Sequence, residues 1–243
     1  MSHIDTSANL NRWRKKSLAE KSLLSFGMLA IAVSVPSWQA TLLIAAIMTA
    51  ATLLGARVVP SVWWKAFTAP LGFLLIGVLT IAFQVHHWRI SLAPGGIELA
   101  ARLAARAFAG ITCLLFIALT TPAADLIAGL RRIGIPAEIA EMTLLMYTFL
   151  FLLTDTAETM NAAQIARLGH ATYGRHMKAL SLLIANLMPR ALSRARALEV
   201  GLAARGWRGE LAVLSAVSPA SPKVIAGVLG LELLVLAIGL ATI

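Results

Sequence analysis

The chain alternates long apolar runs with short basic segments. The main apolar runs cover residues 22–35, 38–54, 66–85, 99–119, 136–153 and 224–243. A helix needs roughly 20 apolar residues to cross the hydrocarbon core of a bilayer, and several of these runs reach that length. The first two runs are shorter and are separated by Pro36-Ser37, so residues 22–54 form either two thin spans or one re-entrant hairpin. The pattern predicts an all-α, polytopic integral membrane protein with about five transmembrane helices.

Basic residues between the runs predict the topology, because cytoplasmic segments carry an excess of Lys and Arg. Arg57 and Lys65 mark a return to the cytoplasm after the first two runs. His86-His87-Trp88-Arg89, followed by Pro94-Gly95-Gly96, is typical of an external interfacial turn. The first run is preceded by a cluster of five basic residues, Arg12, Arg14, Lys15, Lys16 and Lys21. We therefore expect a cytoplasmic N-terminus, a retained first helix without a signal peptide, and a multi-pass protein of the bacterial inner membrane.

The run 136–153 has the length of a span, but its flanks argue against crossing. Glu138 and Glu141 lie near its start, where a lipid-facing helix tolerates carboxylates poorly. Basic residues stand on both sides of it, so both flanks should be cytoplasmic: Arg131 and Arg132 before it, and Arg167, Arg175 and Lys178 after it. We expect a long helix lying in or under the inner leaflet. The next apolar stretch, 179–187, is too short to span and ends at Pro189-Arg190.

Capping signals divide the basic region into helices. Thr120-Thr121-Pro122 is typical of a helix start, with Thr as N-cap and Pro in the first turn, and this helix should close at residues 131–134. A later helix should be brought to an end by Gly206 and Gly209. We therefore expect an N-terminal membrane part of about four spans (1–120), a cytoplasmic coupling-helix region (121–210), and a linker with a C-terminal transmembrane helix (211–243).

Composition supports the membrane class and excludes several others. Hydrophobic residues make up 59% and charged residues 13%, with a net charge of +10, and the mean hydropathy is +0.81. The basic residues cluster between apolar runs, without the interleaved aromatics that nucleic-acid binding favours. Cys113 is the single cysteine, which excludes an internal disulfide and two-cysteine metal motifs. We expect the lipid bilayer, and no nucleic acid, as a partner.

Two arginine motifs lie in the basic region, Ala166-Arg167-Leu168 and Ala204-Arg205-Gly206. Arginine carries a permanent charge and a rigid fork of donors that can hold a partner's carboxylate, and small neighbours let a helix end approach closely. Two similar motifs suggest docking onto two similar partners. The simpler alternatives are a plain helix C-cap for Arg205 and a solvated or snorkelling charge for Arg167.

These motifs, together with Thr-Pro-x-x-Asp-Leu-x-x-Gly-Leu-Arg-Arg-x-Gly-x-Pro over residues 121–136, resemble the transmembrane coupling (T) component of energy-coupling factor importers, which are ATP-binding-cassette (ABC) transporters. The resemblance covers most of the chain and is strongest over 121–206. N-terminal residues are similar to the cobalt-uptake branch of that family: Asp5, Ala8, Asn9, Trp13-Arg14 and Glu20-Lys21. Leu168 departs from the family pattern, which usually has Gly at this place.

The resemblance implies a scaffold that joins two ABC-type ATPase subunits to a substrate-binding membrane subunit (S component), with a small accessory membrane subunit as a further partner. Each Ala-Arg motif would sit in a groove of one ATPase. The implied cargo is cobalt ion for cobalamin supply, with nickel, biotin or another vitamin as the same-class alternative. The chain itself should have no cofactor, no catalytic residue and no metal site.

Alternatives from other classes make distinct demands on the sequence. A membrane-embedded metal-dependent transferase needs clustered Asp residues, whereas Asp5, Asp125 and Asp155 are scattered, and a standalone channel or carrier needs polar residues along several spans. The sequence contains no Gly-x-x-x-x-Gly-Lys-Ser/Thr loop, so we expect ATP hydrolysis in partner subunits and no enzyme activity in this chain. Adjacent His86 and His87 would point about 100° apart on a helix, which favours an interfacial anchor over a metal site.

Overall fold

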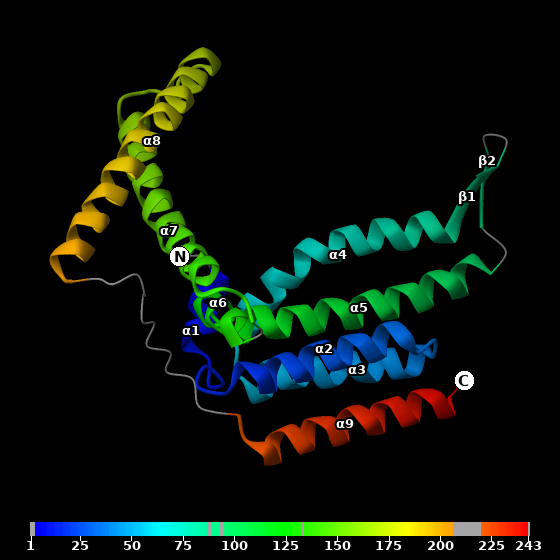
Figure 1. Cartoon of the computed structure of the whole chain (residues 1–243). Coiled ribbons are helices and arrows are strands. Elements are labelled where there is room, and N and C mark those ends of the chain that lie inside the picture. The colour runs from blue at the N-terminus through cyan, green and yellow to red at the C-terminus, as the bar shows by residue number, and fades with distance from the viewer. Residues whose placement is uncertain (1–2, 87–88, 93–94, 133, 207–219, 243) are drawn as a thin grey trace. The chain divides into compact units, whose positions relative to one another are not determined.

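The computed structural model describes residues 3–86, 89–92, 95–132, 134–206 and 220–242, and within these ranges it is helical apart from one short hairpin (Figure 1). The chain divides into two compact units, one formed by Met1–Leu126 with Ser215–Ile243 and the other by Ile127–Leu214. The first unit contains α1 (His3–Leu10), α2 (Leu18–Ser34), α3 (Trp38–Ala50) with the π-helical turn η1 (Ala51–Gly55), α4 (Pro60–Ala82), β1 (Phe83–His86), β2 (Arg89–Leu92), α5 (Gly96–Thr120) and α9 (Pro222–Ala241). The boundary falls within α6 (Ala123–Arg132), and the second unit contains α7 (Ala137–Ala166) and α8 (Tyr173–Ala204).

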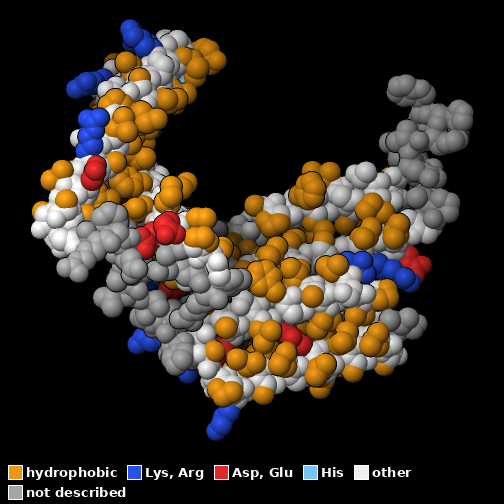
Figure 2. Space-filling model, viewed as in Figure 1, with side chains coloured by type: hydrophobic (Ala, Val, Ile, Leu, Met, Phe, Trp, Pro, Cys, Tyr) orange, Lys and Arg blue, Asp and Glu red, His pale blue; other side chains and the backbone are white. Residues whose placement is uncertain are grey.

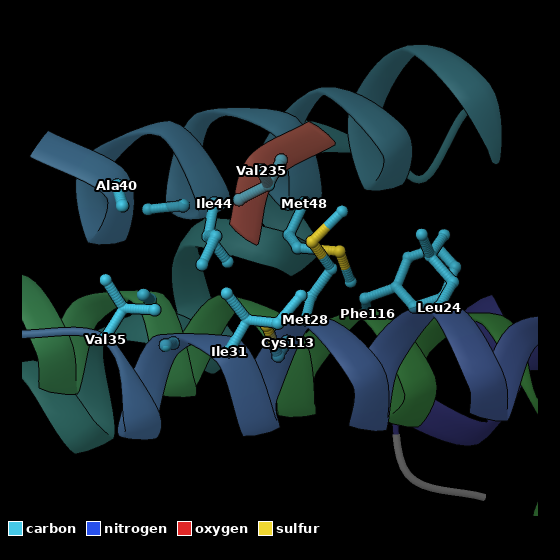
Figure 3. Packing of buried hydrophobic residues seen from close by; sticks show 13 residues of the cluster. Leu24, Met28, Ile31, Val35, Ala40, Ile44, Met48, Cys113, Phe116 and Val235 are labelled. Atoms are coloured by element: carbon cyan, nitrogen blue, oxygen red, sulfur yellow. The ribbon is translucent and has the colours of Figure 1, made fainter. Parts of the chain in front are cut away.

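Helix α5 is the centre of the first unit, because α2, α3 and α4 all pack against it while α9 packs on α2 and α3 (Figure 1). Their shared core is apolar, and its side chains point toward one another (Figure 3). Met28 of α2, Ile44 of α3 and Phe116 of α5 are fully buried there. Cys113 lies in the same core with no exposed surface. The outward faces of these helices remain apolar, as expected for helices surrounded by lipid.

The contact between α2 and α9 depends on small residues. A Cβ atom at Gly239 would lie 2.8 Å from Cγ1 of Val35. A Cβ atom at Gly27 would lie 2.1 Å from Oε1 of Glu232, a carboxyl in the middle of α9 that is only 9% exposed. Small residues let membrane helices approach closely, which provides the packing energy that the hydrophobic effect does not supply within lipid. Gly27 therefore makes the space that the Glu232 carboxyl occupies.

The N-terminal segment closes one end of this bundle by capping α5. The last carbonyls of a helix lack intrahelical donors. Asn11 Nδ2 donates to the carbonyls of Leu119 and Thr120 at 3.3 and 3.2 Å, and Lys21 Nζ donates to the Thr120 carbonyl at 2.9 Å. A cation at this end also matches the negative end of the helix dipole. Lys21 precedes the apolar part of α2, and its burial lowers its pKa to about 8, against the opposing effect of Asp125.

Other residues of the cobalt-branch pattern also have structural roles in this segment. Ala8 is 1% exposed, and the Trp13 ring meets Phe116 edge to face at a centroid distance of 5.6 Å. Glu20 Oε1 accepts a hydrogen bond of 2.7 Å from the backbone N–H of Ser221, which immediately precedes α9. The segment therefore ties α5 and α9 together near one end of the bundle.

Residues 22–54 form two helices. The start of α2 reaches the last residue of α5, because Lys21 contacts Thr120, and its end reaches Arg106, whose Nη2 donates to the Val35 carbonyl at 3.2 Å. This length along α5 favours two crossing helices over a shallow hairpin. Among the described residues, five helices are long and apolar enough to cross a membrane, namely Trp38–Gly55, Pro60–Ala82, Gly96–Thr120, Glu138–Ala166 and Pro222–Ala241. Helix α2, with 17 residues, is shorter than these. Our interpretation that the helix at 136–153 does not cross stays a prediction.

Some expectations were wrong in detail. Thr121 does not cap α6: its Oγ1 has no hydrogen-bond partner in the described ranges, Thr120 is still part of α5, and the Pro122 carbonyl accepts the first bonds of α6, from the N–H groups of Asp125 and Leu126. The span expected at 66–85 is α4, which starts at Pro60 and gives way at Phe83 to the β1–β2 hairpin. His87, Trp88 and Pro94 of the expected external turn, and Gly209 of the expected helix end, lie outside the described residues.

Candidate functional site

The two Ala-Arg motifs lie in the second unit, at the ends of its long helices. Ala166 is the last residue of α7 and Ala204 is the last residue of α8. The structure does not bring the motifs together, because α8 separates them. Its 32 residues, at roughly 1.5 Å each, give a path of about 48 Å between the connector that carries Arg167 and the end that carries Arg205.

The two motifs have the same backbone geometry. Arg167 has φ −93° and ψ 17°, and Arg205 has φ −92° and ψ 7°. The next residue is left-handed in both, with φ 58° at Leu168 and φ 70° at Gly206. Both ends are closed by bonds between residues three apart, from Arg167 N to Gln164 O at 3.2 Å and from Arg205 N to Leu202 O at 3.1 Å. Each arginine is therefore presented at the same kind of helix end.

Leu168 adopts this geometry at a cost. A left-handed conformation places Cβ close to the following carbonyl, which costs a residue other than glycine roughly 1–2 kcal/mol. The turn is completed by Gly169, whose N–H bonds to the Gln164 carbonyl at 2.9 Å, and a Cβ atom at Gly169 would lie only 2.9 Å from that same oxygen. The departure from the family pattern at Leu168 therefore changes the residue and keeps the backbone shape.

Both arginines are accessible. Ala166, Arg167, Leu168, Ala204, Arg205 and Gly206 are all exposed. Across the described ranges, no side chain forms a hydrogen bond or ion pair with either guanidinium, since the ion pair found there joins Arg102 to Glu98. An exposed guanidinium at a helix end that holds no internal partner can bind a carboxylate of another protein. A plain C-cap explains the backbone at each motif but does not explain why arginine recurs.

The connector between α7 and α8 is compact. Thr172 caps α8 by accepting a bond from the Arg175 N–H, and the rings of His170 and His176 meet edge to face at 4.4 Å between centroids. These two imidazoles are a pair and not a larger cluster: within the residues that the structure describes, no three His, Cys, Asp or Glu residues gather as metal ligands would. The connector is therefore held by local contacts at the start of α8.

Sequence reasoning missed three features of the first unit. The sequence shows Glu232 as a lone carboxylate in the last apolar run. Its position against Gly27 could not be predicted, because it depends on the packing of α2 with α9. Glu98 and Arg102 pair at 2.6 Å, whereas Arg106, one turn further along α5, donates to the Val35 carbonyl. Asn11 gave no signal in the sequence, because its partners at residues 119 and 120 are distant along the chain.

Comparison with known proteins agrees with this architecture. The family described as cobalt transport protein CbiQ matches residues 10–214. The cobalt transport protein CbiQ of Rhodobacter capsulatus is 48% identical over 236 residues, which is 97% of each chain. An uncharacterised protein of Methanocaldococcus jannaschii is 27% identical over 91% of this chain and 87% of its own length. A putative fused cobalt transport protein CbiMQ of Methanocorpusculum labreanum is 26% identical over 86% of this chain and 37% of its own length. This membrane-embedded chain therefore belongs to the CbiQ family of cobalt transport proteins.

Proposed function

We propose that this chain is the energy-coupling scaffold of an ATP-driven cobalt importer, linking two ABC-type ATPases to a substrate-binding membrane subunit. The observation that carries the proposal is the repeated helix end, with one backbone geometry and one exposed arginine at Arg167 and again at Arg205. Two copies of the same docking element fit two copies of a similar partner. The cobalt cargo is supported by the family and by the relative in Rhodobacter capsulatus.

In this proposal the second unit transmits force. Each arginine holds a carboxylate in the groove of one ATPase, and ATP-driven closure of the pair moves the two docking ends relative to each other. Because α8 directly connects the ends and α7 packs on it, their displacement shifts the whole helix pair. That shift tilts the substrate-binding subunit between its open and closed states, by a rigid-body movement of packed helices.

Partner subunits supply the remaining functions. Cobalt selection belongs to the substrate-binding subunit, assisted by a small accessory membrane subunit, and ATP hydrolysis belongs to the ATPases. The relative named as a putative fused cobalt transport protein supports a close association with a further protein part, since this chain matches only 37% of its length. The chain sits in a bacterial inner membrane with its N-terminus in the cytoplasm, as the basic residues before α2 favour.

The test is ATPase retention by single-arginine variants. Arg205→Ala should leave the protein inserted and folded but weaken ATPase binding by at least about 30-fold, because truncating one member of a desolvated charge pair costs about 2–5 kcal/mol. Arg167→Ala should act in the same direction. Arg196→Ala, an exposed arginine within α8, is the matched control and should retain binding. Full ATPase binding and transport in both motif variants would contradict the proposal.

A further inference from the structure

The second unit contains a basic cleft that the docking proposal does not use. It lies where α7 and α8 pack together and encloses about 330 Å³. Three of its lining residues come from α7, namely Leu152, Leu153 and Thr156. The remaining ones come from α8, namely Arg190, Ser193, Arg194 and Ala197. The cleft therefore combines two guanidinium groups and a hydroxyl with an apolar wall.

The charge of this cleft is not compensated from within the chain. Arg190 and Arg194 are one helical turn apart on the same face of α8, and both are exposed. Within the ranges that the structure describes, no carboxylate lies within ion-pair distance of either arginine. Figure 2 shows basic side chains spaced along the α7–α8 region with hydrophobic side chains beside them. Two adjacent cations in one cleft indicate an anionic ligand with several acceptor oxygens, such as a phosphate group.

The hydroxyl groups of the cleft differ in their availability. Thr156 Oγ1 already donates to the Leu152 carbonyl at 2.7 Å. Ser193 has no hydrogen bond from its hydroxyl to any residue that the structure describes, so this hydroxyl is free to donate to a phosphate oxygen. The cleft therefore offers donors from Arg190, Ser193 and Arg194.

The apolar wall indicates which kind of phosphate. Leu152 and Leu153 end the apolar part of α7, and the polar segment that starts at Thr154 follows them directly. A site at such a boundary meets a ligand whose anionic head joins an apolar tail. Basic pockets between membrane-associated helices on the cytoplasmic side bind anionic phospholipid headgroups in this way.

We propose that the α7–α8 cleft binds an anionic phospholipid, with the phosphodiester held by Arg190, Arg194 and Ser193 and the acyl chain against Leu152 and Leu153. The bound lipid anchors the middle of α8, midway between the two docking ends, to the membrane surface. Anionic lipid then becomes a structural component of the helix pair that carries Arg167 and Arg205.

The experiment measures lipid binding to the purified full-length chain in mild detergent by native mass spectrometry. Phosphatidylglycerol is titrated against phosphatidylcholine, and inorganic phosphate is added as a competitor in a separate arm. We expect preferential retention of phosphatidylglycerol, about fivefold weaker in Arg190→Ala or Arg194→Ala and weaker still in the double variant, because each basic residue contributes separately to anionic-lipid binding. Ser193→Ala should also weaken the binding of phosphatidylglycerol relative to the parent chain.

Two matched controls keep the proposal falsifiable. Arg196→Ala removes the same charge from a residue of α8 that does not line the cleft, and Thr156→Val removes a hydroxyl that is already bonded to the backbone; both should leave lipid binding within about twofold of the parent chain. Equal weakening by Arg196→Ala would mean diffuse surface attraction and would overturn the site. Equal retention of phosphatidylcholine, or binding of free phosphate without phosphatidylglycerol, would overturn the assignment to an anionic lipid.

Discussion

The packing of Glu232 against Gly27 makes a quantitative prediction about the contact between α2 and α9. In Gly27→Ala the new methyl group would lie 2.1 Å from Oε1, 2.4 Å from Cδ and 2.7 Å from Oε2 of Glu232. Ordinary contacts between such atoms need about 3.5 Å or more, so the carboxyl or the helix must shift. Overpacking of this kind costs about 1–3 kcal/mol. For a chain of this size we expect a fall in melting temperature of about 2–12 °C.

Cys113 provides the assay. It is the single cysteine of the chain and is fully buried in the core formed by α2, α3, α5 and α9. A thiol-reactive fluorogenic dye therefore reports unfolding of this core in detergent without any engineered label. Gly227→Ala is the matched control on α9, because a Cβ atom there meets nothing within 4 Å, and it should not destabilise the protein.

A double-mutant cycle decides whether Glu232 is the cause. Glu232→Ala removes the carboxyl that the new methyl group meets, so Gly27→Ala should be far less destabilising in that background. If Gly27→Ala left the melting temperature unchanged, the flexible end of the Glu232 side chain would have moved aside at little cost, and the predicted overpacking cost would be refuted. If it destabilised both backgrounds equally, the carboxyl would not be the group that fills the space at Gly27.

Further predictions concern the cap of α5, the helix ends and the topology. Asn11→Ala should cost about 1–3 kcal/mol in the Cys113 assay, because two terminal carbonyls of α5 lose a donor, whereas exposed Arg14→Ala should cost little. Lys21 has a pKa of about 8 in the folded chain against 10.5 in the unfolded chain, so the folded state binds fewer protons between these pH values. The free energy of unfolding of the parent chain, relative to that of Lys21→Met, should therefore rise from pH 8 to pH 10.5. A difference between the two chains that stays constant over this pH range would exclude this burial cost. Leu168→Gly should protect the last turn of α7 from hydrogen exchange by about 1 kcal/mol and Gly206→Ala should weaken the last turn of α8 by a similar amount; the opposite signs would refute the left-handed geometry. A cysteine at position 175 in a Cys113→Ala chain should resist labelling from outside sealed cells, and labelling there would refute cytoplasmic flanks for the helix at 136–153.

The sequence predicted helices more reliably than their contacts. Hydropathy and charge located α5 to within three residues of its start, because a helix exposed to lipid must consist largely of apolar residues. The Ala-Arg motifs could be recognised in the sequence, but the shared backbone geometry of Arg167 and Arg205 could not. A glycine at position 168 would have predicted a left-handed conformation, whereas Leu168 does not. The threonine N-cap predicted for α6 was wrong, because α5 continues through Thr120 and Thr121 is the residue that ends α5. The three-part division at residues 120 and 210 stays a prediction.

Long-range polar contacts were the main feature that the sequence did not predict. Asn11, Lys21 and Glu20 bond to groups roughly a hundred or more positions away, at Thr120 and Ser221. A pattern along one chain cannot show such pairs, whereas the local pair of Glu98 with Arg102 follows from helical spacing alone. Four of the N-terminal residues that resemble the cobalt branch therefore have a structural explanation that emerged only from the fold, namely Ala8, Trp13, Glu20 and Lys21.

Photocrosslinking from the two helix ends tests the central claim most directly. A photoreactive amino acid is placed at Ala166 or at Ala204, which are exposed and keep helical backbone, and the control position is Phe73, which is 83% exposed on α4. In the assembled transporter, both helix ends should crosslink to ATPase subunits and Phe73 should not. ATPase crosslinks missing from either end, with the complex intact, would contradict a scaffold that docks two ATPases through matching arginine motifs.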